Sequence, residues 1–178
     1  MSLRAASVAP PMESRARFTQ RAFPGCSIDA HGKPCARLRL ETLLVPLDFS
    51  ACSRGGLQYA VDLALRFKAR LILVHVIRST WLSAKVHAKA NRELEEELHA
   101  HGEKDLAELA KQHLAPEISV QMRVRIGRPA TEIVAAAREC NADLILLSTH
   151  GRTGLTCRLL GSTAEEVVRL AHCPVMMV

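Results

Sequence analysis

Residues 41–50, Glu-Thr-Leu-Leu-Val-Pro-Leu-Asp-Phe-Ser, decide the fold of this chain. Within them, Thr42–Leu47 is a short apolar run without alternation, which is typical of a strand buried on both faces of a parallel sheet. Asp48 and Ser50 follow with the short polar side chains that begin helices. The next apolar residues fall on one helical face: Leu57, Ala60, Val61, Ala64 and Leu65. The stretch therefore predicts a buried strand that leads directly into a helix.

The same pattern continues along the chain. Arg70–Val76 predicts a second buried strand. The segment from Ala84 to about Leu114 is rich in Ala, Glu, Lys and Leu and predicts a long helix, in which Gly102 is a candidate break. Apolar residues alternate with polar ones over Ile118–Ile126, which predicts a third strand with one wetter face, near an edge of the sheet.

The last third of the chain completes the pattern. Gly127-Arg128-Pro129 is a turn that places proline at the first position of a helix. Asp143–Leu147 predicts the fourth strand, and Pro174–Val178 predicts a terminal strand. Between them, Gly161-Ser162 opens the last helix, whose expected inward residues are Val167, Val168 and Ala171.

Strands that alternate with helices predict an α/β fold with an open five-stranded parallel sheet, helices on both faces and doubly wound connections. We expect one such domain over residues 41–178. In these sheets ligands bind at the carboxyl ends of the strands, where the strand order reverses. The first strand is followed by Asp48, and the fourth by the polar run Ser148–Ser162. We therefore expect these two strands to be neighbours that flank the ligand site.

The run Ser148–Thr163 has the composition of a phosphate-binding loop. Gly151 and Gly154 permit close approach of the backbone to a ligand. Gly161-Ser162 lies at a helix start, where backbone N–H groups and a partial positive charge favour anions, and Ser162 can cap that helix or donate to a phosphate. Two arginines, Arg152 and Arg158, add positive charge to the same loop.

The run resembles the universal stress protein family, whose ATP-binding members carry the motif G-x2-G-x9-G-[S/T]. Here Ser148 replaces the first glycine, Gly151 is the second, and Gly161-Ser162 closes the motif. The family's opening V-P-x-D-x-S resembles Val45–Ser50, and its H-V strand end resembles His75-Val76. The closing C-P-V-x-V resembles Cys173–Val178, so the resemblance covers about residues 41–178.

The resemblance implies an adenine nucleotide α-hydrolase-like fold, bound ATP and a divalent ion, usually Mg²⁺, on its phosphates. It also implies a homodimer formed through the terminal strand Val175–Val178. The implied nucleotide-binding residues are Pro46, Asp48 and Val76 around the adenosine, Leu147 and Ser148 beside the ribose, and Gly151, Arg152, Gly154, Gly161, Ser162 and Thr163 along the phosphates.

Several of these residues also have ordinary structural explanations. Asp48 is a candidate cap of the first helix, and the glycines are candidate turn residues. His75, near the end of a buried strand, fits a structural role better than a catalytic one. Ser148 either weakens the site, if its position needs positive φ, or serves equally well, if only a small side chain is needed. We prefer the second interpretation of Ser148.

The sequence favours a binding module of stress response or signalling over an enzyme. It contains no paired carboxylates, no Cys–His nucleophile arrangement and no Walker lysine motif. Slow ATP hydrolysis remains open, as does a protein-interaction dimer of the same fold that binds no nucleotide. The six cysteines include no C-x-x-C pair and no short metal-ligand spacing. His87, His99, His101 and His113 fit the solvated face of the long helix, so we expect no metal site.

Residues 1–40 predict a disordered basic tail outside this domain. They hold seven basic and two acidic residues, whereas residues 41–178 hold 17 and 16, so the folded part is nearly neutral. Nucleic-acid binding would therefore depend on the tail, and with only 3% aromatic residues base stacking is disfavoured. A transit peptide, an over-extended start and an added leader are alternatives for the tail. No run spans a bilayer, and we expect a cytoplasmic protein with reduced thiols.

Overall fold

The computed structural model of the chain describes residues 26–28, 34–36, 39–78, 88–148 and 161–178. It has two compact units, Met1–Leu38 and Arg39–Val178. In the first unit, β1 (Cys26–Ile28) pairs antiparallel with β2 (Pro34–Ala36). The sequence shows no strand pattern here, because three-residue strands are too short to show a period. Disorder of the tail remains a prediction.

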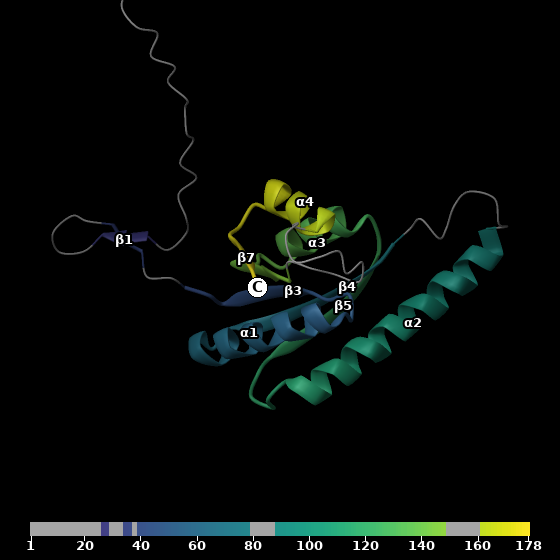
Figure 1. Cartoon of the computed structure of the whole chain (residues 1–178), viewed down its shortest axis with the longest axis horizontal. Helices are drawn as coiled ribbons and strands as arrows, with labels where there is room; N and C mark the ends of the chain where they lie inside the picture. The colour runs from purple at the N-terminus through teal and green to yellow at the C-terminus, as the bar shows by residue number, and fades with distance from the viewer. Residues whose placement is uncertain (1–25, 29–33, 37–38, 79–87, 149–160) are drawn as a thin grey trace, which may run out of the picture. The chain divides into compact units, whose positions relative to one another are not determined.

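The second unit contains the predicted parallel sheet with its helices (Figure 1). Its strands are β3 (Thr42–Pro46), β4 (Arg70–Arg78), β5 (Val120–Gly127), β6 (Leu144–Leu147) and β7 (Val175–Met177). Its helices are α1 (Ala51–Phe67), α2 (Ala88–His113), α3 (Pro129–Glu139) and α4 (Ser162–Leu170). The spatial order of the strands is β5-β4-β3-β6-β7, and every neighbouring pair is parallel. The predicted α/β class and doubly wound sheet are confirmed, with β5 at one edge as expected.

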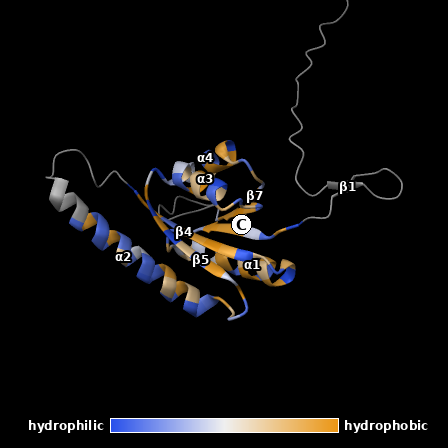
Figure 2. Cartoon of the chain, turned by 180° about the vertical axis from the view of Figure 1, so that it is seen from behind, coloured by the Kyte–Doolittle hydropathy of each residue, from blue (hydrophilic) through white to orange (hydrophobic). Residues whose placement is uncertain are grey.

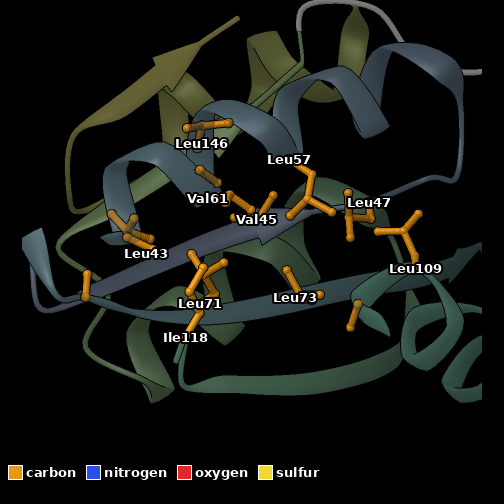
Figure 3. Packing of buried hydrophobic residues seen from close by; sticks show 14 of the residues in the cluster. Leu43, Val45, Leu47, Leu57, Val61, Leu71, Leu73, Leu109, Ile118 and Leu146 are labelled. Carbon is orange, nitrogen blue, oxygen red and sulfur yellow. The ribbon is translucent and has the colours of Figure 1, made fainter. Parts of the chain in front are cut away.

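Two hydrophobic clusters lie on the two faces of this sheet, which explains the apolar runs of its central strands β3 and β6 and of the first half of β4. One cluster packs residues of α1 and α2 against the sheet, among them Leu57, Leu106 and Leu109. Figure 3 shows part of it, with Leu43 and Val45 of β3 beneath Val61 of α1. The other cluster packs α3 and α4 against the opposite face. In Figure 2 the strands are accordingly hydrophobic, and much of the long α2 is hydrophilic.

Three details of the helices differ from the sequence-based expectations. Helix α2 runs without interruption through Gly102, because this glycine packs tightly against the sheet rather than ending the helix. Val168 was expected to point inward but is 45% exposed, since it lies about 100° around α4 from the fully buried Val167. Leu65 is 43% exposed for the same reason, next to the buried Ala64.

In the parts of the chain that the structure describes, no helix combines the length and apolar character needed to cross a membrane.

Candidate functional site

The strand order reverses between β3 and β6, as the sequence predicted. These strands pair in parallel with Leu44 opposite Ile145. Two residues further along, β3 ends at Pro46 and β6 ends at Leu147. Both predicted site residues therefore lie at the carboxyl end of the sheet. Connections from these two strands lead to opposite faces of the sheet, which leaves a crevice position between them.

Val76 lies at the same edge, on the other neighbour of β3. Pro46 is paired with Val74, and the Leu47 N–H donates to the Val74 carbonyl at 2.8 Å. Val76 is two residues beyond this pair and is half-buried. It packs against the cluster that also contains Leu147 and Ala164. The structure therefore brings Val76, the end of β6 and the first turns of α4 onto one face of the sheet.

Helix α4 begins at this face, and among the described residues no side chain caps its first turn. Its N-cap is Gly161, which has no side chain to satisfy the first N–H groups. Ser162 is therefore the first helical residue and not the cap, which corrects one of its two predicted uses. Its side chain is exposed, and that of Thr163 is half-buried. The first-turn amides and the partial positive charge of the helix form an arrangement that suits an anion.

The remaining residues predicted to contact phosphates lie outside the described residues. These are Gly151, Arg152 and Gly154, within the segment 149–160. Ser148, which precedes this segment, is half-buried. Among the described non-glycine residues, positive φ angles occur at Phe49, Lys68 and Asn141, so Ser148 holds an ordinary backbone conformation. Serine is therefore unstrained at this position, in keeping with the interpretation that we preferred.

Asp48 forms a turn before α1 rather than capping the helix. Its Oδ1 accepts a hydrogen bond from the Ser50 N–H at 3.0 Å. The N-cap is Ser50, whose Oγ accepts from the Ser53 N–H at 3.1 Å. The interpretation of Asp48 as the cap is therefore wrong, although Asp48 does organise the approach to the helix. Its half-buried carboxyl group lies just beyond the end of β3.

His75 has the structural role that the sequence favoured. Its ring Nδ1 lies 2.8 Å from the Leu47 carbonyl oxygen, which can only accept, so Nδ1 carries the proton in this contact. Its ring also packs on Phe49, with centroids 4.4 Å apart and planes at 38°. Phe49 has a φ of 62°, which is rare for an aromatic residue, and no pattern in the sequence indicated it.

A charged network on β5 likewise left no signal in the sequence. Arg125 contacts Glu132 at 2.7 Å and Glu139 at 2.8 Å, and Arg123 contacts Glu139 at 3.1 Å. Arg125 donates hydrogen bonds to the carboxylates of Glu139 and Glu132, which raises the pKa of Arg125, and the bond that Glu139 accepts from Arg125 lowers the pKa of Glu139. These partners lie 7, 14 and 16 residues apart, on β5 and on the helix that follows it, and the pairing depends on how α3 packs beside β5.

A hollow lies at the opposite end of the sheet from the predicted site. It has a volume of about 850 Å³ at the amino ends of β3 and β4, and its lining includes Thr42, Lys68, Arg70 and Ser119. Arg70 is already engaged there with the Thr42 hydroxyl at 2.8 Å and the Cys140 carbonyl at 3.2 Å. Of the predicted nucleotide-binding residues that the structure describes, none lines this hollow. In the described ranges, no group of three or more His, Cys, Asp or Glu residues could hold a metal ion.

The comparisons with known proteins agree with one another. The sequence profile of the universal stress protein family matches residues 40–178. A universal stress protein of Methanocaldococcus jannaschii, MJ0531, is 35% identical over 141 residues, which cover 78% of this chain and 81% of that protein. The solved structure of the hypothetical protein MJ0577 superposes with a TM-score of 0.70 at 28% identity, covering 79% of this chain and 96% of that one. A universal stress protein solved in complex with cAMP has the same fold, with a TM-score of 0.55 at 24% identity, covering 79% and 98% of the two chains.

Proposed function

This chain belongs to the universal stress protein family, and from this premise we propose that it binds an adenine nucleotide, ATP with Mg²⁺, and acts as a dimeric stress-response module. The observation that carries the proposal is the convergence of three elements at the switch point. The ends of β3 and β6 and the start of α4 lie at one edge of the sheet, beside Val76 of β4. The family relative that was solved with cAMP supports the class of ligand.

The residues divide into an adenosine side and a phosphate side. Pro46, Asp48 and Val76 surround the adenosine, with the Val76 backbone available to the adenine edge. Leu147 and Ser148 lie beside the ribose. The phosphates extend toward the uncapped first turn of α4, where the backbone amides and the Ser162 hydroxyl donate hydrogen bonds. Gly151, Arg152 and Gly154 complete the phosphate loop in this proposal.

Nucleotide binding is tested first on the purified protein. The protein is denatured, the supernatant is analysed by mass spectrometry, and the nucleotide-free protein is then titrated with Mg-ATP in a calorimeter. We expect ATP or ADP in the extract and saturable binding of one nucleotide per chain. An empty extract together with no heat at millimolar Mg-ATP would leave the interaction dimer that binds no nucleotide as the better account.

A matched pair of serine variants tests the site. Ser162 and Ser119 are both exposed, but Ser162 opens α4 and Ser119 borders the hollow at the other end of the sheet. Ser162→Ala removes a donor to a charged group and should weaken Mg-ATP binding about tenfold. Ser119→Ala should leave the affinity unchanged. Equal affinities of the two variants would contradict the placement of the phosphates.

We also propose that β7 forms the dimer interface, because the two edges of the sheet differ in charge. Strand β5 carries the Arg123 and Arg125 network, and charged side chains discourage pairing at an edge. Residues 173–178 have no charged side chain, and Met176 and Met177 are 38% and 42% exposed. Two copies of this edge can pair about a two-fold axis.

The hydrogen-bond directions of β7 supply a test. The Pro174 carbonyl accepts from Ile145, and the Val178 N–H donates to Leu147, so alternate residues face β6 and the N–H of Met177 points outward. Met177→Pro should dissociate the dimer without disturbing the β6 pairing, whereas Met177→Ala retains the N–H and should remain dimeric. Light scattering measures the molar masses of the wild-type protein and of both variants. A Met177→Pro protein that stays dimeric would exclude this interface.

A further inference from the structure

His75 joins the turn after β3 to helix α2. Its Nδ1–H donates to the Leu47 carbonyl at 2.8 Å, and its ring packs on Phe49. It therefore contacts both flanks of Asp48, one through a hydrogen bond and the other through a ring contact. His75 also immediately precedes Val76 in the chain. The side chain of His75 thus connects the ends of β3 and β4, which form the proposed adenosine side.

The turn that His75 contacts holds a costly conformation. Phe49 has a φ of 62°, which a bulky residue keeps only when its surroundings over-determine it. On one side, the Asp48 carboxylate accepts the Ser50 N–H at 3.0 Å. On the other, the Phe49 ring packs on the imidazole and against the cluster beneath α1 and α2. Without these restraints the backbone would relax to a negative φ and turn Asp48 in a new direction.

Helix α2 is fitted to the same imidazole. A Cβ atom built at Gly102 would lie 3.4 Å from His75 Cδ2 and 3.2 Å from both methyl groups of Val124. The helix thus passes directly over His75 at the point where it lacks a side chain. Figure 3 shows Leu109 of α2 near Leu47 and Leu57, which places the helix, the turn and α1 in one packed group. His75 is consequently held from the helix side as well as from the turn.

We propose that His75 is a positioning residue for the nucleotide: it fixes the turn of residues 47–50 so that Asp48 faces the adenosine. The inference rests on the proposed function, since it assumes that an adenine nucleotide binds at this edge. It also specifies where His75 acts. The turn belongs to the adenosine side of the site. Loss of the His75 contact should therefore lower the affinities for AMP and ATP by the same factor and leave the affinity for inorganic triphosphate unchanged.

Two amide variants isolate the hydrogen bond. His75→Asn places an amide nitrogen where Nδ1 stands, and His75→Gln places it one bond further along the side chain. We expect His75→Asn to bind Mg-ATP and AMP within about twofold of the wild type, and His75→Gln to bind both about fivefold more weakly, the effect of one neutral hydrogen bond. Circular dichroism and urea unfolding confirm that each variant is folded, and the amide signals of residues 48–50 in NMR spectra report the turn directly.

The outcomes separate the two proposals. If the wild-type protein binds neither AMP nor Mg-ATP, the proposed function fails. If it binds both, and His75→Gln binds them as tightly as the wild type, the inference about His75 is wrong and the proposed function stands. Equal weakening in the two variants, or a larger loss for ATP than for AMP, would also overturn the positioning role.

Discussion

Replacing Gly102 by alanine tests how closely α2 is fitted to the sheet. Glycine inside a helix normally lowers stability, and alanine at a free position restores about 1 kcal/mol. At Gly102 the added Cβ would meet Val124 at 3.2 Å and His75 at 3.4 Å, closer than most real Cβ contacts. Val124 is 9% exposed and belongs to the packed cluster, so it has little room to move.

The magnitude follows from these two opposing effects. Overpacking a well-filled interior costs about 1–3 kcal/mol, and the helical gain offsets about 1 kcal/mol of it. We therefore expect Gly102→Ala to reduce the free energy of unfolding by about 1 kcal/mol. For a domain of this size the change corresponds to a decrease in Tm of about 3 °C.

Gly55 provides the matched control. It lies within α1 and is exposed, and a Cβ atom added there would have no neighbouring atom within 4 Å. Gly55→Ala should therefore gain only the helical term and stabilise the protein by about 1 kcal/mol. The two substitutions are chemically identical, so their opposite signs would isolate the effect of packing.

Urea unfolding followed by far-ultraviolet circular dichroism measures both variants. The double variant Gly102→Ala/Val124→Ala adds a check, because removal of the Val124 methyl groups makes room for the new Cβ atom. The double variant should lose less free energy of unfolding than the sum of the losses in the two single variants. A stabilised Gly102→Ala protein, or strictly additive effects in the double variant, would refute the close fit of α2 over His75.

Three further predictions concern other parts of the domain. Gly127 has a φ of 156°, and an added Cβ would lie 2.8 Å from Glu132, so Gly127→Ala should cost about 2 kcal/mol in urea unfolding; a change below about 0.5 kcal/mol would contradict the strain. Ser50→Ala removes the cap of α1 and should cost about 1 kcal/mol, and a neutral effect would contradict the assignment of the cap. Burial raises the pKa of the Cys173 thiol from 9.0 to about 11, so the thiol ionises at a lower pH in the unfolded chain than in the folded protein. The contribution of the neutral thiol to stability should therefore be complete below about pH 9 and decrease as the pH rises toward 11. Cys173→Ala should flatten the dependence of the free energy of unfolding on pH in this range.

The sequence was most informative where strands are buried on both faces. Thr42–Leu47 and Asp143–Leu147 could be recognised as strands because apolar runs bounded by polar residues have few other uses in an α/β domain. Their neighbouring positions followed from the residues at their carboxyl ends, since the switch point is where ligands bind. Pro46 and Leu147 were predicted as site residues from the resemblance to the family, and the structure places both at these carboxyl ends.

Features that depend on packing between distant segments could not be predicted. Gly102 looked like a helix break because the sequence does not show that Val124 and His75 occupy the space beside it. The positive φ of Phe49 depends on the ring of His75, 26 residues further along the chain. Val168 was assigned inward because neighbouring valines look alike, and only the orientation of α4 separates it from Val167.

The most direct test of nucleotide binding at the switch point is a titration of the isotope-labelled protein with Mg-ATP, followed through its backbone amide signals. The account predicts that the largest shifts occur at Asp48, Val76, Ser148 and Ser162, at the carboxyl ends of the strands. Shifts concentrated instead at Thr42, Lys68 and Ser119, around the hollow at the opposite end, would contradict it.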